Sequence, residues 1–530
     1  MPGQEPKGLP KLAHRCKRGL RSWLPLLVTA VAFVVYTLTA APGLTFAHHG
    51  TDGGDLITAA RTLGIPHPPG YPTYTLLAWL FTHLPIGSLA YRIHLLSAAS
   101  AALGVGLLCW TVQALSPDDK SSDVLSVATG LTAAFAPLLW SQAVIAEVYT
   151  LLTLFAVLLF RLWVHWRNGG PDSVLWLSAF LLGLGLGSHL TLALSIPAAL
   201  VLLWPQRHRW WRIRVLPPCI GFFFLGLLIY VYLPLAAAHQ PPLNWGNPQT
   251  WEGFLWVVTA RPYQNLIFGL KWAEVPGRMA TWARLLDKQF GWWGLALALA
   301  GFWGWWQQDR LLTLFLLTWT LLAGTYSFFY NTPDSYVYLL PVLLLWTLAW
   351  SEGVRRLFHL LGQLGQVGRR LALMGLLALP LLSLGIHWPL VDLSDDYETS
   401  AYLNQILDKL DPAALVITQG DAPTFALWYA LYAEGQRPDV AVVNVPLLVY
   451  PWYRAQVRHL YPDLNVHEPG VTQNVPEVLV GDLITGSLPF RPIYATDPEP
   501  AWQTQFCFVP IASTSLYRVL PQPAAQSHCP

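Results

Sequence analysis

The chain has 530 residues, of which 54% are hydrophobic and only 11% are charged, and its net charge is +2. Soluble domains are about 25% charged, so this composition excludes a disordered chain and argues against a series of ordinary soluble domains. It also excludes nucleic-acid binding through a basic face, and it leaves a polytopic membrane protein.

The charges divide the chain near residue 390. Residues 1–389 contain 25 Lys and Arg against 14 Asp and Glu, whereas residues 390–530 contain 6 against 15. This asymmetry predicts a basic cytoplasmic N-terminus over 1–22, a transmembrane domain over 23–389, and an acidic, extracytoplasmic tail domain over 390–530.

Eleven segments are apolar and long enough to be candidate membrane-spanning helices. A turn is predicted between the fifth candidate, 174–188, and the sixth, 190–204, by Gly183, Gly185 and Gly187 followed by Ser188 and His189. The candidates are 23–46, 90–115, 124–144, 149–166, 174–188, 190–204, 215–236, 291–307, 311–329, 336–351 and 371–389.

Clusters of Lys and Arg orient these helices, because basic segments stay cytoplasmic. The N-terminus is basic and has no small-residue cleavage site, so the first helix is expected to run outward. Alternation then places 204–214 and 352–370, each with four Arg, on the inner side. Alternation places three parts outside: the loops 47–89 and 239–290, and the tail. The second loop contains five basic residues, which argue against this placement only weakly because long loops translocate largely regardless of charge.

The first external loop opens with an acidic pair, in Asp52-Gly53-Gly54-Asp55. The residues after Gly54 have helical periodicity and end at Gly64, which predicts a short interfacial helix. One interpretation is that Asp52 caps this helix and Asp55 completes a capping-box-like pair. The other is that a carboxylate held there deprotonates a hydroxyl, and the two are compatible.

A proline-rich segment follows, His67-Pro68-Pro69-Gly70-Tyr71-Pro72. Three prolines and a glycine predict an extended, turned and rigid backbone. The segment is either a plain connector or a binding loop that holds His67 and Tyr71 beside the carboxylates.

Further polar residues occur where predicted spans meet on the same side of the membrane. Glu147 is either functional or bound structurally to a neighbour such as Arg92. His189 and Asp334 lie at two other outer junctions, with Tyr338 one turn beyond Asp334. No Walker motif, dinucleotide fingerprint, HExxH or serine elbow is present, which argues against a nucleotide-driven pump.

The tail mixes strand and helix patterns. Leu415–Thr418 and Val440–Val443 are typical of short buried strands, and the stretch 424–433 between them is typical of a helix. An α/β fold is therefore expected. Gly420-Asp421 is either a plain turn or an acceptor-site candidate, and Cys507 and Cys529 could pair in an oxidising compartment.

The motif from Asp52 to Tyr71 resembles the opening signature of a bacterial membrane family of formerly unknown function. That family is similar to the eukaryotic transmembrane protein O-mannosyltransferase. Its usual form is Asp-Ser-Gly-Glu-Leu-Ile followed by His-Pro-Pro-Gly-Tyr-Pro, so Asp55 stands where Glu is usual. Three later stretches also match, namely 146–149, 244–248 with 254–256, and 420–440.

The resemblance implies a polytopic, GT-C-like glycosyltransferase of the bacterial plasma membrane. Such an enzyme moves a sugar from a polyprenyl-phosphate carrier to a protein or lipid acceptor at the outer leaflet. Asp52 would be the base and Asp55 the second acid, with no obligatory metal, although a divalent cation remains possible. The other expected substrate-binding residues are His67, Arg61 and Arg92 toward the phosphate, Glu147 and Asp334 toward sugar hydroxyls, and Tyr71, Tyr149, His189 and Tyr338.

A transporter or flippase for a lipid-linked or polar solute is the alternative from another class. It would require paired, broken helices with midplane charges in two similar halves. No such repeat is present in the sequence, and the acids cluster on one face.

Overall fold

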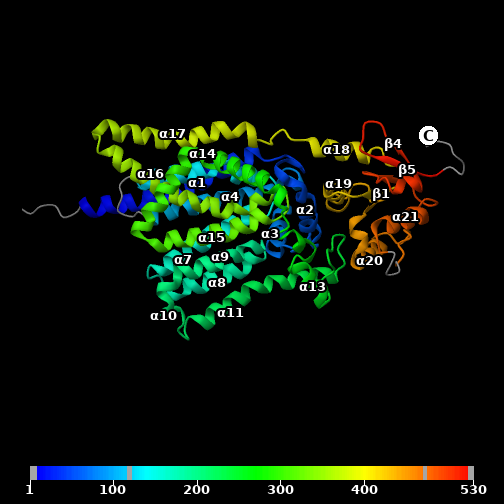
Figure 1. Ribbon diagram of the computed structural model, residues 1–530, viewed down its shortest axis with the longest axis horizontal. Coiled ribbons are helices and arrows are strands. Elements are labelled where there is room, and N and C mark those ends of the chain that lie inside the picture. The colour runs from blue at the N-terminus through cyan, green and yellow to red at the C-terminus, as the bar shows by residue number, and fades with distance from the viewer. Residues whose placement is uncertain (1–8, 116–121, 469–473, 523–530) are drawn as a thin grey trace, which may run out of the picture.

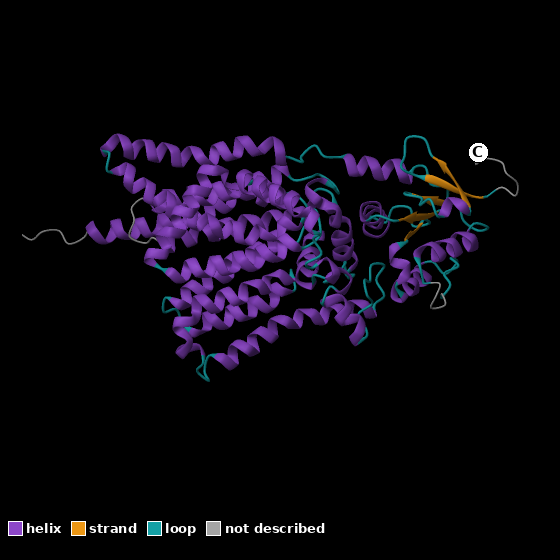
Figure 2. Ribbon diagram, viewed as in Figure 1, coloured by secondary structure: helices purple, strands orange, loops and turns teal. Residues whose placement is uncertain are grey.

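The computed structural model describes residues 9–115, 122–468 and 474–522. A bundle of long helices forms most of the molecule, and the tail lies beyond one end of it (Figure 1). All strands of the described residues belong to the tail (Figure 2).

A helix is present in each of the eleven predicted spanning segments, because an apolar run in a bilayer must satisfy its backbone hydrogen bonds internally. Their bounds are α1 Leu9–Thr39, α4 Leu89–Leu115, α5 Ser122–Ala134 with α6 Pro137–Ala143, α7 Tyr149–Arg167, α8 Asp172–Leu186, η2 Leu190–Leu194 with α9 Ser195–Leu203, α11 Leu216–Leu227 with η4 Leu228–Val231 and α12 Tyr232–Ala238, α14 Val275–Gln308, α15 Arg310–Phe329, η7 Ser335–Leu339 with α16 Leu340–Gly362, and α17 Gly365–Val391.

The number of spans stays a prediction. By length and apolar composition seven helices of the described residues can cross a membrane, or eight if the pair α5 and α6, bent by 63°, is one span. Trp23–Thr39 and α8 are shorter apolar helices. The predicted turn between the fifth and sixth spans is present, since α8 ends at Leu186 and η2 begins at Leu190.

One predicted loop is shorter than expected. The external loop was expected to reach residue 290, but α14 begins at Val275 and continues to Gln308. Gly291 interrupts it with φ 60° and ψ 162°, a conformation that glycine tolerates. The first part of α14 is polar, so a pattern of apolar residues does not predict it. The interruption at Gly291 coincides with the first residue of the predicted span 291–307.

The segments at the end of the bundle nearer the tail contain short helices (Figure 1). Helix α2 follows η1 directly, and Leu63 ends it in the left-handed conformation. The bounds are η1 Ala47–Asp52, α2 Gly53–Thr62, α3 Pro72–Thr82, α13 Trp251–Val258, η5 Arg261–Leu266 and η6 Trp272–Glu274, while η3 Trp204–Gln206 and α10 Arg207–Trp210 lie at the far end of the bundle.

The tail contains a mixed five-stranded sheet of order β2-β1-β3-β5-β4. β1 pairs in parallel with β2 and β3, and β5 pairs antiparallel with β3 and β4. The two predicted strands correspond to β1 and, shifted by one residue, β2. The bounds are α18 Glu398–Leu407, β1 Leu415–Thr418, α19 Asp421–Trp428, a π-helix Tyr429–Ala433, β2 Ala441–Asn444, η9 Pro446–Val449, α20 Pro451–Leu460, α21 Pro476–Ser487, β3 Ile493–Ala495, η11 Trp502–Thr504, β4 Phe506–Pro510 and β5 Tyr517–Pro521.

The tail packs tightly against the start of α2. A Cβ atom at Gly54 would lie 2.4 Å from the carbonyl oxygen of Phe425 in α19, so only glycine permits this approach. This contact brings α19 close to the acidic pair at the start of α2. Cys507 lies in β4, and Cys529 lies outside the described residues.

Candidate active site

Asp55 is the buried centre of a hydrogen-bond network. Its carboxylate accepts hydrogen bonds from the backbone N–H of His67 at 2.9 Å, from the Trp245 indole at 3.0 Å and from His67 Nδ1 at 2.7 Å. Its side chain is 0% exposed. Both oxygens are occupied, so this geometry favours a positioning role for Asp55 over a direct contact with substrate.

Asp52 is the accessible acid of the pair. Its side chain is 39% exposed, and one carboxylate oxygen lies 3.6 Å from His67 Nε2. It makes no capping hydrogen bond to α2. The capping interpretation is therefore not observed for either acid, and Asp52 is left free to accept a proton.

Burial and the neighbouring charges together set the pKa of Asp52. Burial raises the pKa of Asp52 to about 6, helped by Asp421, Asp55 and Asp334 and opposed by His67. Burial lowers the pKa of His67, but Asp52 and Asp55 outweigh this and bring it to about 9. At neutral pH the pair is thus a carboxylate beside an imidazolium, which suits a base that works near pH 7.

The proline-rich segment holds His67 in place. Gly70 has φ 84°, and a Cβ there would lie 2.9 Å from Val257 and 3.1 Å from Leu233. Tyr71 follows with φ 37°, also in the left-handed region, and the Pro68–Pro69 bond is cis. The segment fixes His67, which is 7% exposed, bonded to Asp55 and 3.6 Å from Asp52, and its role as a binding loop stays a prediction.

Aromatic rings from four separate segments form a wall beside this pair. Tyr71 contacts His67 with ring centroids 5.1 Å apart and stacks on His189 at 6.0 Å. His189 lies 5.7 Å from Tyr149 and 5.5 Å from Tyr338. The structure therefore brings together four residues that were selected from four different places in the sequence.

Glu147 and Asp334 lie within electrostatic range of the same centre. Burial raises the pKa of Glu147, and the charges of Asp52 and Asp334 raise it further. Glu147 is 3% exposed and does not pair with Arg92 among the described residues. The ion pair with Arg92 is therefore not observed, but a structural hydrogen bond is, because the Glu147 carboxylate accepts one from the backbone N–H of Val148 at 3.3 Å.

Two predicted phosphate ligands lie elsewhere. The Arg92 guanidinium donates to the backbone carbonyls of Thr82, Ile86 and Gly87, so it stabilises the turn between α3 and α4. Arg61 is exposed in the last turn of α2, at the opposite end of that helix from Asp52. Charge suggested both residues, and among the described residues neither forms an ion pair with Asp52 or Asp55.

Three further residues complete the site. Trp245, from the loop before α13, donates to Asp55, and Phe425 of the tail stacks on His67 at 6.4 Å with an interplanar angle of 12°. Asp421 also belongs to the tail. Burial and the charge of Asp55 raise its pKa, and the charge of His67 opposes this rise. Trp245 and Asp421 occur in the stretches that matched the resembled family, which was the signal available in the sequence.

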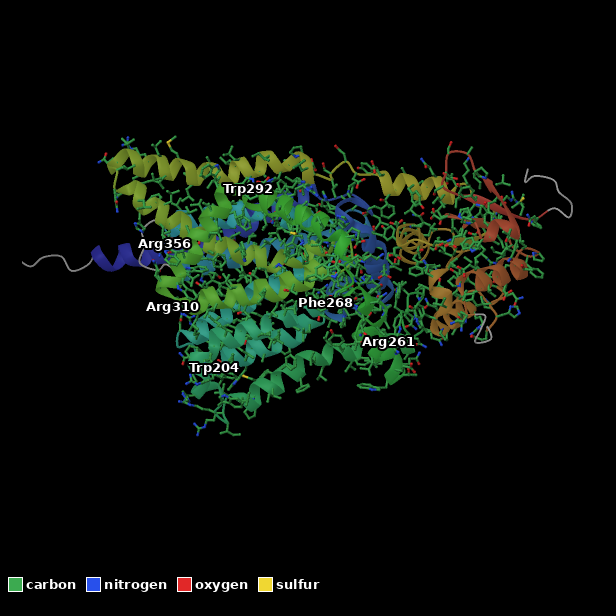
Figure 3. All side chains as sticks on the ribbon, in the orientation of Figure 1. Trp204, Arg261, Phe268, Trp292, Arg310 and Arg356 are labelled. Atoms are coloured by element: carbon green, nitrogen blue, oxygen red, sulfur yellow. The ribbon has the colours of Figure 1, made fainter. Side chains whose placement is uncertain are left out.

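Acids at the other end of the bundle have a different environment. Asp172, Asp309 and Glu352 each form ion pairs with arginines. Arg310 and Arg356 lie at this end with Trp204, whereas Arg261 and Phe268 lie at the end nearer the tail (Figure 3). Within the described residues no group of three or more His, Cys, Asp or Glu is arranged to hold a metal ion.

Comparisons with known proteins identify relatives of the whole chain. Residues 52–212 match the protein O-mannosyl-transferase TMEM260 N-terminal domain, and residues 399–465 match the TMEM260-associated domain 2. The mouse protein O-mannosyl-transferase TMEM260 is 29% identical over 92% of this chain and 73% of its own length. The Dictyostelium discoideum protein of the same name is 24% identical over 87% of this chain, which spans 62% of that protein.

Solved structures share the fold. The crystal structure of ArnT from Cupriavidus metallidurans bound to undecaprenyl phosphate superposes with a TM-score of 0.54 at 12% identity, covering 95% of this chain and 98% of that one. The apo form of the same protein gives a TM-score of 0.54 and covers 94% and 98%. This likeness shows a polytopic, helical GT-C-like fold.

Proposed function

We propose that this chain transfers mannose or a similar hexose from a polyprenyl-phosphate carrier. The premise is that it is related to the eukaryotic protein O-mannosyl-transferase TMEM260 and is a membrane glycosyltransferase. The acceptor is a hydroxyl group of a protein or a lipid. The observation that carries the proposal is the exposed Asp52 carboxylate, with its pKa raised to about 6 beside a fixed His67.

In the proposed reaction the acceptor oxygen attacks the anomeric carbon as the carbon–oxygen bond to the phosphate breaks. The acceptor proton moves to the Asp52 carboxylate, the configuration inverts, and polyprenyl phosphate leaves with the bonding electrons. Asp55 and Trp245 hold His67 in its orientation. The His67 imidazolium supplies positive charge next to the region where negative charge develops on the leaving phosphate.

The site is proposed to face the outer side of a bacterial plasma membrane, with the tail domain outside and the N-terminus in the cytoplasm. The arginine clusters at the opposite end of the bundle support this orientation, since basic segments stay cytoplasmic. A lipid-phosphate leaving group lies at the bilayer surface, and the proposed orientation puts Asp52 at that surface as well. Because the donor contains no nucleotide, no divalent ion is required, and transfer is expected to continue in a chelator.

The test is transfer by the purified protein, supplied with a polyprenyl-phospho-mannose and candidate hydroxyl acceptors. Asp52→Asn should reduce kcat/KM by about 10²–10⁴-fold, the usual contribution of a general base. Asp408→Asn, a substitution of an exposed acid of the tail, is the matched control. Full activity of Asp52→Asn would exclude Asp52 as the base, and solute movement across vesicles without transfer would exclude the proposed function.

A further inference from the structure

A wide concavity lies where α17 passes into the tail. It has a volume of about 780 Å³ and is lined by Phe46, Ala47, Tyr402 and the acidic segment 392–398. Ala47 begins η1, the short helix that ends at Asp52. This concavity therefore opens beside the segment that presents the proposed base.

A second concavity, of about 730 Å³, lies at the carboxyl ends of the parallel strands β1 and β3. Gln419, Asp497, Glu499 and Tyr517 are among its lining residues. Ligands of sheets with parallel strands bind beyond the carboxyl ends of those strands. Gln419 also lies two residues before Asp421, whose charge acts on Asp52.

A contact between Tyr402 and Ser515 links the two concavities. The Tyr402 hydroxyl hydrogen-bonds to Ser515, which lines the second concavity, while Tyr402 itself lines the first. We call these two neighbouring concavities together the acidic groove. Its acids are Asp392, Asp395, Asp396, Glu398, Asp497 and Glu499, and no Lys, Arg or His lines it among the described residues.

The negative charge of the groove has no counterion in the described part of the chain. None of its six acids forms an ion pair there, although several other acids of the tail pair with arginines. Asp392 and Asp396 accept hydrogen bonds from neutral groups and shape the wall. The carboxylates of Asp395, Glu398, Asp497 and Glu499 make no hydrogen bond with described residues, so they are free to bind a cationic ligand.

A second observation points to a ligand. Thr496 lines the groove and is 3% exposed, yet its hydroxyl has no hydrogen-bond partner in the described structure. A buried hydroxyl without a partner is costly, and most such groups are satisfied by protein, water or a ligand. A polypeptide lying in the groove would supply backbone N–H and C=O groups at this point.

We propose that the acidic groove binds the acceptor as a polypeptide segment rich in Lys or Arg, and directs a Ser or Thr hydroxyl of that segment to Asp52. This inference rests on the proposed function and specifies its acceptor class. The cationic side chains replace the missing counterions, and the hydroxyl enters the site past η1.

The test uses the full chain in detergent and a fluorescent synthetic peptide of alternating Lys and Ser or Thr, with a matched peptide that has Gln in place of Lys. Anisotropy measures binding without any need for turnover. We expect the Lys peptide to bind about tenfold more tightly than the Gln peptide at low salt, and the difference to shrink as salt screens the carboxylates.

The variant Asp395→Asn/Asp497→Asn/Glu499→Gln should remove that preference. Its control is Asp408→Asn/Glu477→Gln/Asp482→Asn, which neutralises the same residue types at exposed positions outside the groove and should retain the preference. Thr496→Val removes only the unpartnered hydroxyl, and it should weaken both peptides by a few fold without loss of fold.

Transfer from polyprenyl-phospho-mannose is measured on the same samples, so that the two proposals can fail separately. Equal binding of both peptides, or an unchanged preference in the groove variant, would overturn the groove as the acceptor site even if transfer occurs. A preference that the groove variant loses, with no transfer to any acceptor, would uphold the groove and overturn the proposed function.

Discussion

The contact between His67 and Asp52 can be tested through the pH dependence of transfer. Wild-type kcat/KM should fall as the pH drops below about 6, because Asp52 must be ionised to act as the base. A protonated His67 favours the ionised form of Asp52. Replacing His67 by a neutral residue should therefore raise the pKa of Asp52 and move the acid limb to higher pH.

The distance between the two groups sets the size of this effect. At 3.6 Å, two unit charges interact by about 1 kcal/mol at the dielectric constant of water. Solvent screens the pair because Asp52 is 39% exposed, and since the His67 ring is only 9% exposed, the water value is the lower limit of the interaction. Since 1.36 kcal/mol corresponds to about one pH unit, the limb should move from about 6 to about 7 or higher.

His67→Asn is the variant of choice. An asparagine amide nitrogen can take the place of Nδ1 and keep the donation to Asp55, while the positive charge is lost. The assay is initial transfer rate against pH from 5 to 9, roughly the range that the two pKa values span, with thermal unfolding as the check on fold. An acid limb that stays in place in a folded variant would refute the coupling of His67 to Asp52.

Three other substitutions have clear expected outcomes. Asp421→Asn removes a negative charge that raises the pKa of Asp52, so the acid limb should move to lower pH in the same rate assay. Asp55→Ala leaves His67 buried without its carboxylate and should lower the free energy of unfolding by about 3–5 kcal/mol, measured by denaturant titration. Gly54→Ala forces a Cβ against Phe425 and should cost about 1–3 kcal/mol in stability, with loss of transfer.

The controls separate local effects from general ones. Asp52→Ala should leave stability almost unchanged, because Asp52 makes no capping bond, so a loss equal to that of Asp55→Ala would contradict the division of roles. Gly375→Ala is the control for Gly54, since a Cβ added at Gly375 would have no neighbouring atom within 4 Å among the described residues. An upward shift of the acid limb in Asp421→Asn would show that the tail does not act on Asp52 through its charge.

Local patterns predicted the parts of the fold that depend on local physics. A run of apolar residues must become a helix in a bilayer wherever it occurs, so each predicted segment contains one. β1 was predicted residue for residue, because a short β-branched run between turn residues has few other solutions. β3, β4 and β5 were not predicted, since their stability comes from pairing across the sheet and not from a distinctive local pattern.

The candidate site divides in the same way. Asp52, His67 and Tyr71 were recognisable because they are close in sequence and are held by prolines and glycine. Arg92 was selected by charge, and only the folded turn shows that its guanidinium donates to three backbone carbonyls. The sequence shows that a side chain is charged, but it does not show which hydrogen-bond partners that side chain has in the folded protein.

By itself, the sequence determined that this is a membrane protein whose two ends differ in charge, and which loop presents an acid beside a rigid histidine. Only the tertiary structure decided that Asp52 is partly exposed while Asp55 is buried and hydrogen-bonded. Trp245 and Phe425 come from segments far beyond that loop in the chain, yet Trp245 bonds to Asp55 and Phe425 closes over the start of α2. The burial and the hydrogen-bond partners of a side chain depend on packing between segments that are distant in the sequence. Only the tertiary structure shows which of those segments are in contact.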